Sequence, residues 1–343
     1  MSVRKMKAFV IEAPHRAAIR TVDYPVPGPG EVTIQVRNCG ICGTDYHIYE
    51  GTFLSPYPII PGHEFSGVVE QVGEGVSSFK IGDRVTADPT LYCGECEYCL
   101  THRTNQCSNW GALGNTVDGA MAEYVKVPAR NVVKMKMAMT FAEGAFVEPV
   151  ACVVHGMNRL QIRMGERVVL FGAGAMGLQL VQAIARSGAS ELVVVDVSKD
   201  KLELSLRLGA TRGVLAEEAQ DVLSRDYPQG FDVVIDVTGI PSVIERQFRH
   251  MGPTARFLQF GVTPKNATIA VNPFDLYQKD WSLIGSMAIN QTFIPALRWV
   301  QEGRIDVKPL LSGTIALEQL PDMLSKPKAA DMLKVQVIIG QEE

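Results

Sequence analysis

The second half of the chain alternates short apolar runs with segments whose hydrophobic residues recur at helical spacing. Four apolar runs are typical of buried strands, namely Arg167–Phe171, Leu192–Asp196, Phe231–Asp236 and Arg256–Phe260. Gly177–Arg186 and Lys199–Leu208 have the spacing of helices. Strands that alternate with helices predict an α/β fold with a doubly wound parallel sheet.

The first 150 residues have a different pattern. Short β-like runs at Val32–Arg37, Phe65–Val72 and Ala122–Val127 are separated by turns rich in glycine and proline. This pattern favours a β-rich, barrel-like unit. The tail predicts a helix at Pro295–Gly303 and a strand at Leu333–Ile339. No parallel neighbour is left for that strand, so we expect it to return to the first domain.

Composition narrows the class of protein. The 343 residues are 46% hydrophobic and 20% charged, with a formal net charge of −4, which suits two globular domains and excludes a disordered chain. The charge gives no reason to expect nucleic acid as a partner. No apolar run reaches the roughly 18–20 residues of a membrane span. The N-terminus lacks the apolar stretch of a signal peptide, so we expect a cytoplasmic protein.

A glycine-rich turn follows the first strand of the α/β half. Gly172, Gly174 and Gly177 match the G-x-G-x-x-G pattern that brings a backbone close to a pyrophosphate, with Ala175 and Met176 inside the turn. Asp196 ends the next strand, where a carboxylate accepts hydrogen bonds from ribose hydroxyls and repels a 2′-phosphate. Lys201 is placed to reach the same ribose. The turn predicts NAD rather than NADP; the alternative is a packing turn with an unrelated aspartate.

Four of the seven cysteines lie in one short segment, with the spacing C-x2-C-x2-C-x7-C. They are Cys93, Cys96, Cys99 and Cys107. Four soft ligands close a tetrahedron around a structural zinc and leave no open position. Free thiols, disulfides and an iron–sulfur cluster are the alternatives from ligand type alone.

Cys42 and His63 are candidates for a second, catalytic zinc, which needs three protein ligands and an open position. On spacing alone, a core thiol and a hydrogen-bonded imidazole remain the alternative.

Together these segments resemble the zinc-dependent medium-chain dehydrogenase/reductase superfamily. The motifs are Gly40–Asp45, Gly62–Glu64, Gly82–Val85, the four cysteines, Glu148–Pro149 and the Gly172–Gly177 turn. Phe146–Gly156 resembles the polyol branch, which includes sorbitol, arabinitol and arabinitol-phosphate dehydrogenases. The resemblance implies a GroES-like catalytic domain from residues 1–150, completed by 290–343, and a Rossmann NAD-binding domain at 151–289.

The resemblance also implies roles around the catalytic zinc. Cys42 and His63 would be ligands, and Glu64 would be a ligand or lie close to the metal. The third position falls on Glu148, which we prefer over the nearby thiol of Cys152. Asp45 would orient His63.

The proton of the substrate hydroxyl would pass from Thr44 through the nicotinamide ribose towards His47 and solvent. A route through the zinc-bound water and Glu148 is the alternative. Cys39 is expected to be a packed core thiol.

Further NAD contacts implied by the resemblance are Thr238, Gly261, Val262, Ser286 and Met287, with Lys334 near the pyrophosphate.

The resulting hypothesis is an NAD-dependent zinc enzyme that oxidises a secondary hydroxyl of a polyol, phosphorylated or not, to a ketose. A threonine or simple secondary-alcohol dehydrogenase is the nearest alternative. A non-catalytic NAD-binding structural protein is the remote one. A homodimer or homotetramer is the family expectation.

Overall fold

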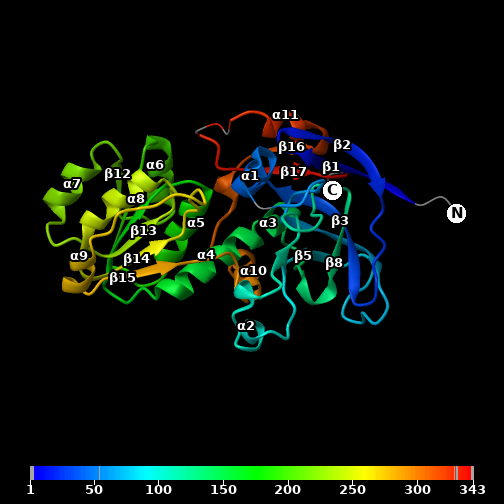
Figure 1. The fold of residues 1–343 in the computed structure, drawn as a ribbon, viewed down its shortest axis with the longest axis horizontal. Coiled ribbons are helices and arrows are strands. Elements are labelled where there is room, and N and C mark those ends of the chain that lie inside the picture. Colours follow the sequence, from blue (N-terminus) through cyan, green and yellow to red (C-terminus); the bar gives the residue numbers. More distant parts are fainter. Residues whose placement is uncertain (1–3, 54, 328, 330, 341–343) are drawn as a thin grey trace. The chain divides into compact units, whose positions relative to one another are not determined.

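The apolar runs of the second half form a six-stranded parallel sheet in the computed structural model, which describes residues 4–53, 55–327, 329 and 331–340. The order is β12–β11–β10–β13–β14–β15, so the chain starts at the centre and winds outward in both directions (Figure 1). The strands are β10 (Arg167–Phe171), β11 (Glu191–Asp196), β12 (Arg212–Leu215), β13 (Phe231–Asp236), β14 (Met251–Gln259) and β15 (Ser282–Gly285). This is the Rossmann order, and it confirms the predicted doubly wound sheet.

Five helices connect these strands. They are α5 (Ala175–Ile184), α6 (Lys199–Arg207), α7 (Ala219–Asp226), α8 (Pro241–Gln247) and α9 (Pro273–Gln278). The helix expected from Gly177 begins two residues earlier, because Gly174 adopts an extended backbone and serves as the N-cap of α5. The glycine turn therefore leads directly into a helix N-terminus.

The edge strand β12 was not expected from the sequence. It has four residues and contains a glycine, so it is too short to show an apolar period. The opposite edge strand, β15, is equally short. The structure pairs β12 with β11 and β15 with β14.

The first 150 residues contribute most of a second, seven-stranded sheet. Its order is β16–β17–β3–β4–β5–β9, with β8 also paired to β3. The strands are β3 (Glu31–Gly40), β4 (Glu64–Val72), β5 (Arg84–Ala87), β8 (Tyr124–Pro128), β9 (Val132–Lys134), β16 (Leu311–Ala316) and β17 (Lys334–Ile338). The tail strand β17 pairs antiparallel with β3, so it does return to the sheet of the first half. Its parallel neighbour β16 was not expected.

Smaller elements complete this part of the fold. The strands are β1 (Lys5–Ala13) and β2 (Arg16–Asp23), which form an antiparallel hairpin, and the short pair β6 (Thr90–Leu91) and β7 (Gly111–Ala112). The helices are α1 (Gly43–Glu50), α2 (Glu97–Leu100), α3 (Phe141–Ala145), α4 (Val147–Leu160), α10 (Phe293–Gln301) and α11 (Leu320–Leu324). The expected tail helix is α10, which begins two residues before Pro295.

The chain divides into two units by its internal contacts. Unit 1 comprises the described residues of 1–151, 289–303 and 307–343, and unit 2 comprises 152–288 and 304–306. Each has its own apolar core: Phe9 and Phe65 are fully buried in unit 1, as are Val169 and Val234 in unit 2. Cys39 is a buried member of the first core, as expected.

Among the described residues, no helix combines the length and apolar character needed to cross a membrane.

Candidate metal and nucleotide sites

The glycine turn between β10 and α5 has the backbone that the sequence motif predicts. Gly172 has φ +103°, which is unfavourable for a residue with a side chain. A Cβ on Gly177 would lie 1.9 Å from the carbonyl oxygen of Gly172, so only glycine lets the helix approach the strand. At Gly174, by contrast, a Cβ would meet no atom within 4 Å. The open space beside this helix N-terminus is suited to a phosphate group.

Asp196 lies beside this turn at the end of β11. Its carboxylate accepts hydrogen bonds from the backbone N–H of Ala173 at 2.6 Å and of Ser198 at 2.9 Å. Lys201 lies in the first turn of α6, after the N-cap Ser198. Thr238 donates its hydroxyl to Asp236 at 2.7 Å.

The expected nucleotide residues follow the carboxyl ends of five strands of one parallel sheet. Gly172 follows β10, Thr238 follows β13 and Gly261 follows β14, whereas Asp196 ends β11. Ser286 and Met287 come directly after β15. Val262 is exposed next to Gly261. Because parallel strands end at the same edge, the structure brings these residues to the edge where nucleotides bind in such sheets.

In unit 1, Cys42, His63 and Glu64 form a group of possible metal ligands. One ligand atom from each lies within 4.8 Å of the others. Cys42 immediately precedes α1, and Glu64 is the first residue of β4. His63 and Glu64 are buried, whereas Cys42 is partly accessible, so the group has one open side.

Asp45 holds the loops that carry this group. Its carboxylate accepts from the N–H of Cys42 at 2.7 Å and of Gly62 at 3.3 Å. His63 Nδ1 lies 3.8 Å from Asp45 Oδ1, which is too long for a hydrogen bond. Among the described residues this buried nitrogen has no hydrogen-bond partner. Asp45 therefore faces His63, as expected, but without a direct bond.

Lys334, expected near the pyrophosphate, pairs with Glu64 in this structure. Its ammonium is buried in unit 1 and donates to both carboxylate oxygens of Glu64 at 2.7 Å and to the carbonyl oxygen of Ile41 at 3.2 Å. Because its partner Glu64 is 270 residues away, no local pattern could have revealed the pair. Burial lowers the pKa of Lys334, but the negative charges of Glu64, Cys42 and Glu148 and the hydrogen bonds to Glu64 together outweigh burial and raise the pKa.

Glu148 is buried in the first turn of α4. Burial raises the pKa of its carboxyl to about 7, partly offset by the charge of His63. His63 and Glu148 are thus close enough to interact electrostatically within unit 1. The rival thiol of Cys152, one turn further along α4, is partly buried.

The charges around His63 favour a cation. Burial lowers the pKa of His63, but the negative charges of Cys42, Asp45 and Glu148 outweigh burial and hold it well above its usual value. A thiolate, an imidazole and a carboxylate are also the donor types that zinc prefers. This donor set and the excess of acidic groups fit a metal ion bound by Cys42 and His63, with Glu148 or Glu64 completing the set.

Thr44 and His47 lie on α1 beyond this group. The thiol of Cys42 donates to Thr44 Oγ1 at 3.6 Å, which places that hydroxyl next to the candidate ligands. His47 is exposed, with Nδ1 3.3 Å from Thr52 Oγ1 and 3.6 Å from Glu50. Its ring can therefore exchange protons with solvent.

The four clustered cysteines converge on one point, with one sulfur from each within 4.8 Å of the others. Cys93 Sγ lies 3.5 Å from Cys107 Sγ and 3.9 Å from Cys99 Sγ, and Cys96 and Cys107 are also 3.9 Å apart. A tetrahedron with Zn–S arms of about 2.3 Å has edges of about 3.8 Å, so the cluster has the dimensions of a zinc site. Backbone N–H groups of Ser108 and Cys99 lower the pKa of Cys96 to about 6.

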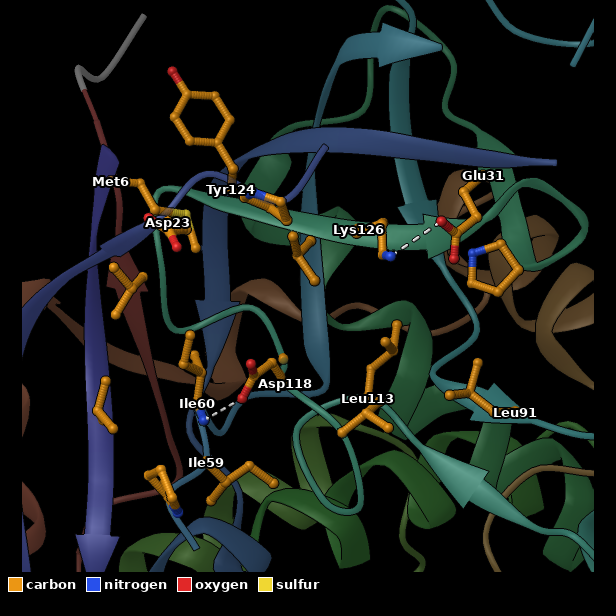
Figure 2. Close-up of a pocket in the computed structure, with 18 residues that line it drawn as sticks. Met6, Asp23, Glu31, Ile59, Ile60, Leu91, Leu113, Asp118, Tyr124 and Lys126 are labelled. Atoms are coloured by element: carbon orange, nitrogen blue, oxygen red, sulfur yellow. Dashed lines mark hydrogen bonds and ion pairs between the residues drawn. The ribbon is translucent and has the colours of Figure 1, made fainter. Parts of the chain in front are cut away.

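A cavity of about 630 Å³ lies elsewhere in unit 1 (Figure 2). Apolar side chains such as Met6, Leu91 and Leu113 line it, and no expected site residue does. Its polar side chains have partners in the protein: Lys126 pairs with Glu31 at 3.2 Å. The carboxylate of Asp118 likewise accepts from a backbone N–H at 2.9 Å. The cavity therefore shares no lining residue with the metal or nucleotide groups.

Comparisons with known proteins agree with this geometry. Residues 28–137 match the alcohol dehydrogenase GroES-like domain family, and residues 175–302 match the zinc-binding dehydrogenase family. D-arabinitol dehydrogenase 1 of Uromyces fabae is 31% identical, over 97% of each chain. D-altritol 5-dehydrogenase of Agrobacterium fabrum is 33% identical, also over 97% of each. A zinc-binding dehydrogenase of Sinorhizobium meliloti, solved with NADP, has a TM-score of 0.94 at 34% identity, covering 98% of this chain and 99% of its own.

Proposed function

The chain belongs to the zinc-dependent medium-chain dehydrogenase/reductase family, and from this premise we propose that it oxidises a secondary hydroxyl of a polyol to a ketose with NAD. The observation that carries the proposal is the Cys42–His63–Glu64 group beside Glu148. It is supported by the likeness along nearly the whole chain to a D-arabinitol dehydrogenase and a D-altritol 5-dehydrogenase. The reaction removes a hydride and a proton from the carbinol; NAD accepts the hydride and solvent receives the proton.

Cys42 and His63 would hold a zinc ion, and Glu148 would be the third ligand or lie against the metal. Bound zinc supplies Lewis acidity, which lowers the pKa of a substrate hydroxyl. Glu64 is neutralised by Lys334 on both oxygens, which favours Glu148 over Glu64 as the third donor.

The chain's own groups handle the proton. Thr44 Oγ1, which lies beside Cys42, would accept a hydrogen bond from the substrate hydroxyl. His47, exposed on the same helix, would pass the proton to water. A buried carboxyl with a pKa of about 7, such as Glu148, would also hold or release a proton near neutral pH.

The nucleotide would be bound by the Gly172–Gly177 turn through the N-terminus of α5, with Asp196 on the adenosine ribose. The negative charge of Asp196 favours NAD over NADP. The remaining contacts proposed for the nucleotide are Thr238, Gly261, Val262, Ser286 and Met287.

A second zinc in the four-cysteine cluster would have a structural role, giving two metal ions per chain. We further propose a catalytic domain of residues 1–150 with 290–343, a nucleotide domain of residues 151–289, and a homodimer or homotetramer that acts in the cytoplasm.

A substrate panel tests the proposal. The purified protein is incubated with NAD and with pentitols, hexitols, their phosphates, threonine and simple secondary alcohols, and NADH absorbance is followed. Turnover confined to polyols supports the proposal. A preference for threonine or for a simple secondary alcohol would show that polyols are not the substrate class. Absence of turnover with every substrate, in protein that binds zinc and NAD, would contradict dehydrogenase activity.

A further inference from the structure

The side chain of Asn290, in the segment after β15, forms hydrogen bonds with the four-cysteine loop (residues 93–107). Its Oδ1 accepts from the N–H of Thr104 at 3.1 Å and from its hydroxyl at 3.2 Å, and its Nδ2 donates to the carbonyl of His102 at 3.0 Å. Both partners lie between the third and fourth cysteines of the cluster. Thr104 is only 3% exposed, so water cannot easily replace Asn290 if the amide is removed.

Two residues later, Thr292 forms a hydrogen bond with helix α4. Its hydroxyl donates to the carbonyl of Ala151 at 2.7 Å, and both residues are buried. Ala151 lies on α4, three residues after Glu148 and so nearly one helical turn along. Residues 290–292 therefore connect the four-cysteine loop to the helix that carries Glu148, all within unit 1.

The backbone of this connection is held in an unusual conformation. Ala288 has φ +43° and Gln291 has φ +56°, a region that residues with a Cβ seldom adopt. Such a path persists only where surrounding contacts impose it. The hydrogen bonds of Asn290 and Thr292, on either side of Gln291, are contacts of that kind.

We propose that Asn290 is a positioning residue that couples the four-cysteine loop to α4, and through α4 sets the position of Glu148 at the Cys42–His63 metal group. The assignment of that group rests on the proposed function. A metal in the four-cysteine cluster would fix the backbone of residues 102–104, which hydrogen-bond to Asn290. Asn290 would then fix the position of Thr292, and the hydrogen bond of Thr292 would fix the position of Ala151 on α4. A cluster that would otherwise only stabilise the fold then also adjusts the reaction site.

The test compares variants of the full-length, zinc-loaded protein. Asn290→Ala removes the whole connection, and Thr104→Val removes only the hydroxyl bond. Thr104→Ser keeps both bonds and serves as the conservative variant. Gln291→Asn is the matched control, because it changes a neighbouring exposed amide to a residue that tolerates positive φ.

We expect kcat on the best polyol to fall about 10-fold in Asn290→Ala, a fold-change equivalent to the loss of one well-formed hydrogen-bond network, and about 3-fold in Thr104→Val. KM for NAD should stay within about 2-fold of the wild type, because the nucleotide turn is not part of the connection. Thr104→Ser and Gln291→Asn should retain wild-type kcat. Wild-type kcat in Asn290→Ala, even with a lower melting temperature, would show a purely structural contact and overturn the proposal, as would an equal loss in Gln291→Asn.

A second readout does not depend on turnover. Cobalt(II) is exchanged into the Cys42–His63 site, with metal analysis confirming that zinc remains in the four-cysteine cluster. The ligand-field bands of the cobalt report its coordination, so they should shift in Asn290→Ala and in Thr104→Val but not in Gln291→Asn. Unchanged bands overturn the coupling. If the wild type oxidises no polyol, the proposed function fails, but the cobalt bands still test the coupling. If Asn290→Ala does not fold, the bands of Thr104→Val test the coupling.

Discussion

At the scale of single residues, substitutions of the two partly buried thiols Cys42 and Cys152 test whether Cys42 is a metal ligand and whether Cys152 replaces Glu148 as a ligand. Cys42→Ser should lower kcat by more than about 100-fold while NAD binding and the unfolding midpoint stay near wild type, because the residue contributes a ligand rather than core packing. Cys152→Ser is the matched control and should keep its metal and most of its activity. Turnover, metal content and NAD titration measure the difference. Metal loss in Cys152→Ser but not in Glu148→Ala would reverse the ligand assignment.

Asp196 is predicted to set the choice of nucleotide. A carboxylate at the end of β11 repels a 2′-phosphate, so kcat/KM should favour NAD over NADP by at least about 10-fold, and Asp196→Ser should reduce that ratio. Asp275→Asn, an acidic position on α9, which connects β14 to the opposite edge strand β15, should leave the ratio unchanged. Equal use of both nucleotides by the wild type would contradict the assigned role, and the NADP bound to the Sinorhizobium meliloti relative makes this comparison informative.

His250 makes stability depend on pH. Burial lowers the pKa of its imidazole to about 4 in the folded protein, with a smaller contribution from Arg249. Because the unfolded chain binds the proton near pH 6.5, the stabilisation is complete above that pH and is lost as the pH falls towards 4. Urea midpoints measured from pH 7 to pH 5 should therefore fall more steeply in the wild type than in His250→Gln. Replacing the exposed His15 by Gln should not change the slope; parallel slopes for wild type and His250→Gln would contradict the prediction.

The grouping of candidate residues was predictable where a motif is local. The glycine turn and the four cysteines each occupy a short stretch, and the structure brings the four sulfurs together. Cys42 and His63 lie far apart in sequence, so spacing alone left their pairing open. The pairing of Lys334 with Glu64 could not be predicted, because the two residues are far apart in sequence. Asn290 carried no signal at all, since its importance depends on a loop nearly 190 residues earlier.

At the scale of elements, the turn between β10 and α5 contains one glycine that is needed for stability and another that is needed for NAD binding. Gly177→Ala should destabilise the protein by about 1–3 kcal/mol, because the new Cβ would overlap the Gly172 carbonyl. Gly174→Ala meets only open space, so its melting temperature should stay near wild type while NAD binds more weakly. Thermal unfolding and NADH fluorescence titration distinguish the two. Undiminished NAD affinity in Gly174→Ala would mean that no phosphate approaches this turn.

Elements with long apolar runs were recognised from the sequence, and short ones were not. The central strands β10, β11 and β13 are buried on both faces, which gives continuous hydrophobic segments. The edge strand β12 has four residues and shows no period. The β1–β2 hairpin could not be predicted although β1 contains an apolar run, because no residue of β2 is fully buried and β2 therefore shows no alternating pattern.

At the scale of the whole molecule, the return of the C-terminal tail to the first sheet is the main topological feature. The pairing of β17 with β3 joins residues about 300 positions apart, and it also places Lys334 opposite the beginning of β4, where Glu64 lies. The tail thus supplies the one buried cation that neutralises Glu64, leaving the remaining negative charge of Cys42, Asp45 and Glu148 for a metal ion.

The rate of NADH formation before and after removal of the catalytic metal tests the central claim most directly. The protein is treated with a chelator until the metal of the Cys42–His63 site is lost, assayed with NAD and its best polyol, and assayed again after zinc is added. We predict that the activity disappears with the metal and returns with zinc, and that Cys42→Ser shows no such recovery. Full activity in protein shown to lack this metal would contradict the account.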